Sequence, residues 1–239
     1  MTFYEDLSDV YDIVFRENPR AVEFLDDLAG NGGRVLDCAC GTGTCACALA
    51  GRGRDVVGID FDASMIRLAR KKCRGSNVRF IAGDMREAAT LLGDERFDVA
   101  YCIGNSVVHL PDPPAIGDFF RVVYGLLSEN GSFVVQIVNF DRILAQGVTE
   151  LPTIENGEHG VRFRRFYDFE ESKRFVRFRA ELSVRRESSE NEVKLVVLRS
   201  AKLAELLAAA GYGRVELFGG YDRLSHTGES PATVALAVK

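Results

Sequence analysis

The 239-residue chain lacks the features that mark several classes of protein. No apolar run approaches the roughly 20 residues that are needed to span a bilayer. Its 30 basic residues are outnumbered by 35 acidic ones, which argues against a broad nucleic-acid-binding surface. The N-terminal segment, MTFYEDLSDVYD, is acidic and has neither the basic start nor the apolar core of a secretory signal. There are no internal repeats. We therefore expect a cytoplasmic protein that binds neither membranes nor nucleic acid.

Cysteine is present, but its spacing does not favour a metal centre. Four of the six cysteines form the pattern C-x-C-x4-C-x-C at Cys38, Cys40, Cys45 and Cys47. Structural zinc sites more often use C-x2-4-C pairs that are separated by a longer loop. Small buried thiols in a reducing compartment are the simpler interpretation. We expect no metal.

What the chain does have is a strand, a glycine loop and a helix in Arg34 to Ala50, RVLDCACGTGTCACALA. This is the first unit of a Rossmann-like sheet, with a ligand expected over the loop. Gly41 and Gly43 permit positive φ and keep Cβ atoms away from that ligand. The pattern GTGTCA also satisfies the dinucleotide form G-x-G-x-x-A. The loop alone therefore predicts an adenosine-containing ligand, and a nicotinamide-dependent oxidoreductase stays open as an alternative.

The second predicted strand ends in an acid, Asp60, and this residue narrows the choice of ligand. A carboxylate at this place has two oxygens with which to accept both hydroxyls of a ribose. The competing interpretation is a solvent-facing loop acid. Further strands are predicted over 77–85, 97–103 and 132–138, with a helix over 112–127 and a turn at Glu129 to Gly131. These βα units predict an α/β fold with a doubly wound, mostly parallel, seven-stranded Rossmann-like sheet.

After Asn139 the apolar period changes from helical spacing to two. From Val161 to Arg186 apolar and charged residues alternate, which predicts an antiparallel β insertion of two or three strands after strand five. Glu187 to Glu192 is expected to form a polar turn. Ser200 then caps an amphipathic helix, and two final strands follow as a hairpin. We expect a single domain over 1–239, with an N-terminal helical lid at 1–30, a cofactor-binding core at 31–144, the insertion at 145–199 and the last helix and strand pair at 200–239.

The N-terminal segment Phe3 to Phe15 has helical apolar spacing with acids between. It precedes the sheet and is able to lie over the ligand cleft, where Tyr4 and Tyr11 would present hydroxyl groups. Simple docking of an amphipathic helix explains the spacing equally well.

Taken together, VLDCACGTG, GID, GDM and FDVAYC resemble the ordered motifs of class I S-adenosylmethionine-dependent methyltransferases. The resemblance covers roughly residues 34–138. It implies that S-adenosylmethionine is the cofactor, that Asp60 binds the ribose, that Asp84 contacts the adenine and that Asp37 lies near the methionine amino end. The full set of cofactor-binding residues that we expect is Tyr11, Asp37, Ala39, Gly41, Gly43, Asp60, Phe61, Met65, Asp84, Met85, Ile103 and Asn105.

A narrower resemblance concerns the segments CIGNSVVHLPD and NFDRILAQG. They are similar to L-G-N-S-x-x-H-L-P-D and N-Y-D-x-I-L-x-x-G of glycine N-methyltransferases and related sarcosine and dimethylglycine enzymes. The similarity implies catalytic roles for Asn105 and His109, which would face the acceptor, and for Tyr11, which would close over the methyl group. His109 has a pKa suited to a base. A purely structural histidine at a helix entry is the alternative.

The departures from that family concern the acceptor. Glycine-methylating members are expected to carry an arginine directly before N-Y-D, where this chain has Val138. Tyrosines expected on the insertion have no clear counterpart around Leu195 to Arg199. We therefore predict methyl transfer to a small amine or amino-acid-like molecule, with a small carboxylate or hydroxyl acceptor as an alternative. A protein that binds the cofactor without transferring methyl, and a homo-oligomer, both stay open.

Overall fold

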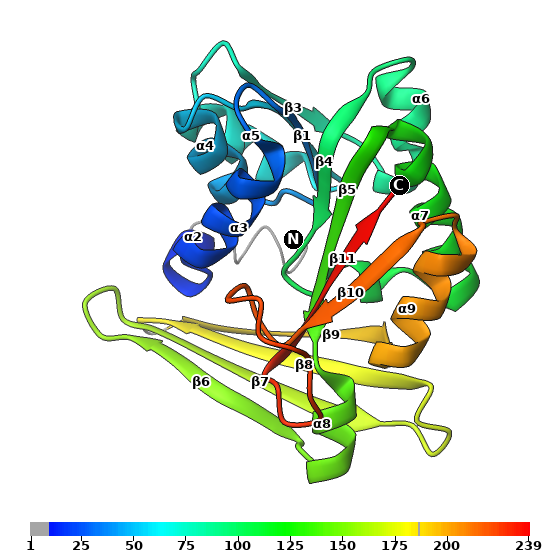
Figure 1. The fold of residues 1–239 in the computed structure, drawn as a ribbon. Helices are drawn as coiled ribbons and strands as arrows, with labels where there is room; N and C mark the ends of the chain where they lie inside the picture. Colours follow the sequence, from blue (N-terminus) through cyan, green and yellow to red (C-terminus); the bar gives the residue numbers. More distant parts are fainter. Residues whose placement is uncertain (1–9, 186) are drawn as a thin grey trace.

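A computed structural model describes residues 10–185 and 187–239 (Figure 1). A seven-stranded sheet has the order β10-β11-β5-β4-β1-β2-β3, in which β1 to β5 run parallel and β11 is antiparallel to both β5 and β10. The doubly wound, mostly parallel sheet is thus confirmed. Its strands are β1 (Arg34–Cys38), β2 (Asp55–Asp60), β3 (Val78–Ala82), β4 (Phe97–Cys102), β5 (Leu127–Val138), β10 (Arg214–Phe218) and β11 (Ala232–Val238).

Helices cover both faces of this sheet. One apolar core lies under α3, α4 and α5, and the larger one lies under α6, α7 and α9. Among the described residues, no helix is long and apolar enough to cross a membrane. The helices are α2 (Tyr11–Val14), α3 (Pro19–Ala29), α4 (Thr44–Gly51), α5 (Ala63–Lys72), η1 (Met85–Glu87), α6 (Ala88–Leu92), η2 (Ser106–His109), α7 (Pro113–Leu126), α8 (Phe140–Gln146) and α9 (Ser200–Ala209).

Local capping explains where several helices begin. The Asn18 side chain accepts hydrogen bonds from the N–H groups of Arg20 and Ala21, and Pro19 occupies the first turn of α3. Asp62 caps α5 through the N–H of Ser64 at 2.7 Å. The expected cap at α9 is wrong, because Ser200 lies inside the helix and donates its N–H to Asp141 at 2.9 Å.

The expected turn at Glu129 to Gly131 is instead an irregularity inside β5. The strand already begins at Leu127, and its register with β4 shifts between the pairs Phe97–Leu127 and Val99–Ser132. Asn130 takes a left-handed φ of 62° at this shift. The extra residues bulge out of the ladder, so the turn-forming residues mark a bulge and do not end the strand.

The insertion after β5 is a separate antiparallel sheet of four strands, not two or three, in the order β6-β7-β8-β9. The strands are β6 (Glu150–Asn156), β7 (Val161–Phe169), β8 (Phe175–Val184) and β9 (Glu187–Val196). The expected turn at Glu187 to Glu192 is therefore wrong, since these residues pair with β8 from Val184 back to Arg179. Polar residues occupy this strand because one of its faces is exposed to water.

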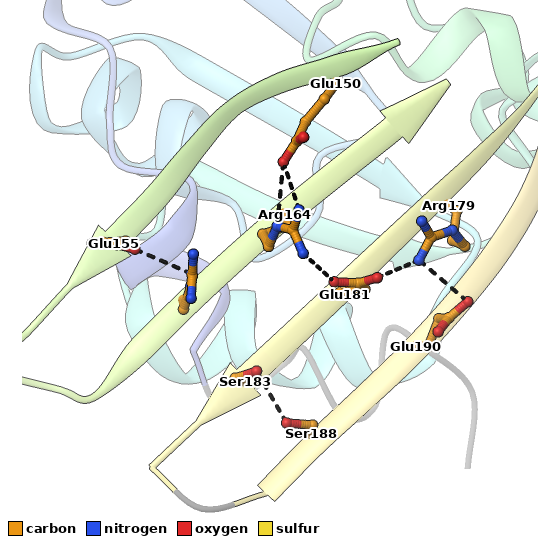
Figure 2. A network of polar contacts seen from close by, with 9 residues as sticks. Glu150, Glu155, Arg164, Arg179, Glu181, Ser183, Ser188 and Glu190 are labelled. Carbon is orange, nitrogen blue, oxygen red and sulfur yellow. Dashed lines mark hydrogen bonds and ion pairs between the residues drawn. The ribbon is translucent and has the colours of Figure 1, made fainter. Parts of the chain in front are cut away.

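The two faces of the insertion differ in kind. On the outer face, Arg164 contacts Glu150 at 3.0 Å and Glu181 at 3.2 Å, and Glu181 also pairs with Arg179 (Figure 2). The inner face is largely apolar, and Figure 1 shows the four-stranded sheet lying across the end of the main sheet at which β4 and β5 finish. The helix predicted over 3–15 is described only as α2, because residues 1–9 lie outside the described part of the chain.

Candidate active site

A cavity of about 670 Å³ lies between the C-terminal ends of the parallel strands, α2 and the inner face of the insertion. Ligand sites in open α/β sheets occur at this edge. The cavity brings together ten of the residues that the sequence predicts for the site. They are Tyr11, Ala39, Gly41, Asp60, Phe61, Met65, Asp84, Met85, Asn105 and His109.

The loop between β1 and α4 contributes backbone to this cavity. Gly41 has a φ of 54°, and a Cβ at that position would lie 3.3 Å from the Tyr11 hydroxyl oxygen. Gly43 does not line the cavity. Its φ is 74°, and a Cβ there would come within 3.0 Å of the Phe80 ring, so this glycine permits α4 to pack closely against the sheet.

Asp60 lines the cavity, and both of its carboxylate oxygens accept hydrogen bonds from the backbone. Oδ2 accepts the N–H of Gly41 at 2.7 Å and Oδ1 accepts the N–H of Asp62 at 2.9 Å. Each oxygen has a second lone pair, so the carboxylate can still accept two further hydrogen bonds. Burial raises the pKa of Asp60 above its ordinary value, although the two backbone N–H groups act in the opposite direction.

Next to Asp60, the ring of Phe61 is 83% exposed and lines the same cavity. A phenyl ring left in water at a cavity mouth gains from any flat ligand that covers it. At the end of the neighbouring strand β3, Arg86 donates from Nε to Asp84 at 2.9 Å, and this hydrogen bond, against the effect of partial burial, lowers the pKa of Asp84. Met85 follows on the same turn.

Asn105 and His109 lie at the start and the end of η2, and both line the cavity. Asn105 takes a left-handed φ of 68°, which asparagine tolerates better than most residues, and its Oδ1 accepts the N–H of Val138 at 3.0 Å. That contact uses one lone pair of the carbonyl oxygen expected to orient the acceptor. The imidazole of His109 reaches the cavity, and desolvation by the protein around it lowers its pKa. It is therefore neutral at pH 7.

The short helix α2 closes one side. Asp12 accepts hydrogen bonds from the hydroxyls of Thr42 at 2.6 Å and Thr44 at 2.9 Å, and it pairs with the Lys72 ammonium at 2.6 Å. Partial burial raises the pKa of Asp12, but hydrogen bonds from Lys72 and the threonines outweigh it and the pKa is lowered. These contacts fix Tyr11 over the glycine loop.

Two other predicted cofactor residues lie outside the 670 Å³ cavity. Asp37 is buried under the loop, where it accepts the Tyr101 hydroxyl at 2.7 Å, and burial raises its pKa to about 8. Ile103 lines an adjoining cavity of about 920 Å³, which shares Phe15, Gly104 and Gln136 with the first. The roles expected for both stay predictions.

The cysteines do not assemble a metal site in the described part of the chain, where no three side chains of cysteine, histidine, aspartate or glutamate gather around one point. All six cysteines are free thiols. Burial raises the pKa of Cys45 to about 12, so this thiol is protonated and unreactive at neutral pH.

Comparison with known proteins assigns this arrangement to a family. A family profile described as a methyltransferase domain matches residues 35–131. The chain is 28% identical over 233 residues to a glycine/sarcosine N-methyltransferase of Parasynechococcus marenigrum (strain WH8102), covering 92% of this chain and 79% of that protein. The profile match and these relatives support a class I S-adenosylmethionine-dependent methyltransferase, an enzyme whose methyl donor is S-adenosylmethionine.

One further sequence relative and one solved structure are also similar to the methyltransferase. A ubiquinone biosynthesis O-methyltransferase of Pseudomonas aeruginosa (strain UCBPP-PA14) is 33% identical over 127 residues, covering 51% of this chain and 52% of that protein. The solved structure of the CcbJ methyltransferase from Streptomyces caelestis superposes with a TM-score of 0.83 at 24% identity, covering 99% of this chain and 97% of that one. That structural likeness extends over the insertion as well as the core.

The residues that line the cavity of the methyltransferase fit S-adenosylmethionine. Asp60 retains acceptor capacity for a ribose, Phe61 offers an exposed ring to an adenine, and Gly41 keeps its backbone clear of a Cβ. These three residues line one cavity.

Sequence reasoning missed the residues that the insertion contributes. Leu151, Phe163, Arg165, Tyr167, Phe178, Asn191, Val193 and Leu195 all line the cavity. The expectation that tyrosine is missing from the insertion holds only around Leu195 to Arg199, since Tyr167 comes from β7. The available signal was the inward register of β7, in which Arg165 and Tyr167 occupy alternate positions of an apolar row.

Proposed function

We propose that this methyltransferase transfers the methyl group to the nitrogen of a small amine. The observation that carries the proposal is that the donor-binding side of the cavity, around Asp60, and the polar acceptor side, around Asn105 and His109, belong to one partly enclosed chamber. The similarity to a glycine/sarcosine N-methyltransferase over most of both chains supports an amine acceptor.

On the donor side, Asp60 accepts the two ribose hydroxyls while Phe61 and Met85 cover the faces of the adenine. Asp84, held by Arg86, offers a carboxylate oxygen at the adenine edge. Tyr11 lies above Gly41 and so covers the loop beneath the donor. When bound, S-adenosylmethionine supplies a methyl group on a sulfonium, which needs no further activation.

On the acceptor side, an amine must present an unprotonated lone pair. Because the pKa of His109 is lowered, its imidazole is neutral, and the unprotonated ring nitrogen is able to accept a proton from the incoming ammonium. The remaining lone pair of the Asn105 carbonyl orients an N–H of the amine. The apolar inner face of the insertion excludes water and so helps to keep the amine neutral.

A hydroxyl group is the second candidate acceptor. It is favoured by the similarity of about half of the chain to a ubiquinone biosynthesis O-methyltransferase. His109 would then act as the base that removes the hydroxyl proton.

The test is a screen of purified protein with S-adenosylmethionine and matched amines, alcohols and carboxylic acids, with release of S-adenosylhomocysteine as the readout. We expect turnover with members of the amine set. Turnover restricted to hydroxyl compounds would overturn the proposal in favour of the second candidate.

A further inference from the structure

Arg165 stands out within the inner row of β7. Residues of a strand alternate between its two faces, so Val161, Phe163, Arg165, Tyr167 and Phe169 share the side that faces the cavity. Arg165 is the one charged residue in this row. Its neighbour Arg164 points to the opposite face, where Glu150 and Glu181 neutralise it (Figure 2).

The guanidinium of Arg165 is partly buried, and its Cζ lies 5.7 Å from the centroid of the Phe163 ring. Nη2 donates to the carbonyl oxygen of Pro152 at 2.7 Å. Nε is buried and has no hydrogen-bond partner within residues 10–185 and 187–239, and no carboxylate of those residues lies within ion-pair distance. Desolvation lowers the pKa of Arg165, yet an arginine stays protonated. A partly buried cation that has an aromatic ring but no carboxylate beside it is costly, so a role for it is expected.

A second polar side chain lies in the same cross-strand row. Leu151, Arg165, Ala180 and Asn191 are in register across β6, β7, β8 and β9. Arg165 and Asn191 both line the cavity, and their backbones are about 10 Å apart because two strand spacings separate them. The small side chain of Ala180 leaves room between the two. The row therefore offers guanidinium and amide donors on an apolar surface.

We propose that Arg165, with Asn191 beside it, binds a carboxylate carried by the methyl acceptor. The acceptor is then an amine that bears a single acidic group. This rests on the proposed function and deepens it. The position where related enzymes were expected to carry an arginine is Val138, which lines the cavity without charge. The other cavity arginine, Arg86, is already paired with Asp84. One uncompensated guanidinium matches one negative charge, which favours a carboxylate over a doubly charged phosphate.

The test compares matched pairs of acceptors that differ in the acidic group. Glycine is paired with ethanolamine, and sarcosine is paired with N-methylethanolamine. β-Alanine and 4-aminobutyrate, each paired with its amino alcohol, increase the distance between the amine and the acidic group. We expect the wild type to prefer the acid of a pair. Arg165→Gln should lower kcat/KM for that acid at least about 30-fold, mainly through KM, and change the alcohol by less than about 3-fold.

Arg164→Gln is the matched control, since it removes an arginine from the outer face, and it should leave the preference for the acid intact. Equal losses for acid and alcohol in Arg165→Gln, or no preference in the wild type, would overturn the assignment. If only alcohols or acids lacking nitrogen are methylated, the proposed function fails instead. In that case, a selective loss of turnover of those acids in Arg165→Gln would still support the assignment of Arg165, and an unchanged turnover would overturn it.

A second measurement does not require methyl transfer to occur. Arg165→Met replaces an uncompensated charge with an apolar side chain of similar length, so we expect it to raise the thermal midpoint of the free protein. Sarcosine or β-alanine added with S-adenosylhomocysteine should raise the midpoint of the wild type but not that of Arg165→Met. A lowered midpoint in the free variant would assign Arg165 to the fold and overturn the proposal.

Discussion

Removal of the Asp60 carboxylate is the perturbation that separates donor binding from folding most cleanly. Its two oxygens are each engaged once, by the N–H groups of Gly41 and Asp62, and each can accept one ribose hydroxyl. Hydrogen bonds to a charged group contribute about 1.5–3 kcal/mol each. Loss of two such bonds in Asp60→Ala should therefore weaken S-adenosylmethionine binding by about 3–6 kcal/mol, which is roughly 10²–10⁴-fold in Kd.

The same substitution should leave the fold nearly as stable as before. Burial raises the pKa of Asp60, so removal of the charge relieves a desolvation cost that offsets the two lost backbone contacts. Titration calorimetry with S-adenosylmethionine and S-adenosylhomocysteine measures the affinity, and thermal unfolding checks the fold. Asp62→Asn is the matched control, because it removes a neighbouring charge but keeps an oxygen to cap α5 at Ser64. A folded Asp60→Ala protein whose affinity is within 3-fold of wild type, about 0.7 kcal/mol, would refute the ribose assignment.

Three other predictions follow from particular contacts. His109→Ala should lower kcat with little change in donor affinity, and the wild-type pH profile should keep its activity to below pH 6.5 because the His109 pKa is lowered; equal losses of turnover and donor affinity would indicate a structural role. The native state keeps a proton on Asp37, whose pKa is raised to about 8, while the unfolded chain releases it near pH 4. Stability from this group therefore falls as pH rises from 5 to 7, by at most about 1.4 kcal/mol per pH unit, and chemical denaturation of Asp37→Asn should show a shallower fall. Asp12→Ala should cost less than about 1 kcal/mol of stability, since the Asp12–Lys72 pair is half exposed. Because α2 is then held less firmly, calorimetry should show a several-fold higher Kd for the donor. An unchanged Kd would show that α2 does not close over the donor.

Much of the core could be predicted because its signals are local. The strand at Arg34–Cys38 and the loop glycines Gly41 and Gly43 each depend on residues close in sequence. Local signals misled where a neighbouring strand decides the structure. Asn130 and Gly131 have turn propensity, but Leu127 and Ser132 on either side of them pair with β4, so they form a bulge within β5. Glu187 to Glu192 are polar, but pairing with β8 makes them a strand.

The site residues also divide into those that local sequence signals predict and those that depend on distant parts of the chain. Asp60 and Asn105 lie at ends of parallel strands, and such ends meet at one edge of the sheet, so their proximity follows from the fold. Arg165 could not be placed in this way. Its contact with the cavity depends on how the insertion lies across the main sheet and on which face of β7 points inward. A shift of one residue in that register would have exchanged Arg165 with Arg164.

The most direct test of the account is the identity of the atom that receives the methyl group. The protein is incubated with S-adenosylmethionine carrying a ¹³C-labelled methyl group and with the acceptor that gives the highest turnover, and the product is analysed by NMR and mass spectrometry. The account predicts a single labelled N–CH₃ group in an amine product. A labelled O–CH₃ group, or consumption of the donor with no methylated product, would contradict it.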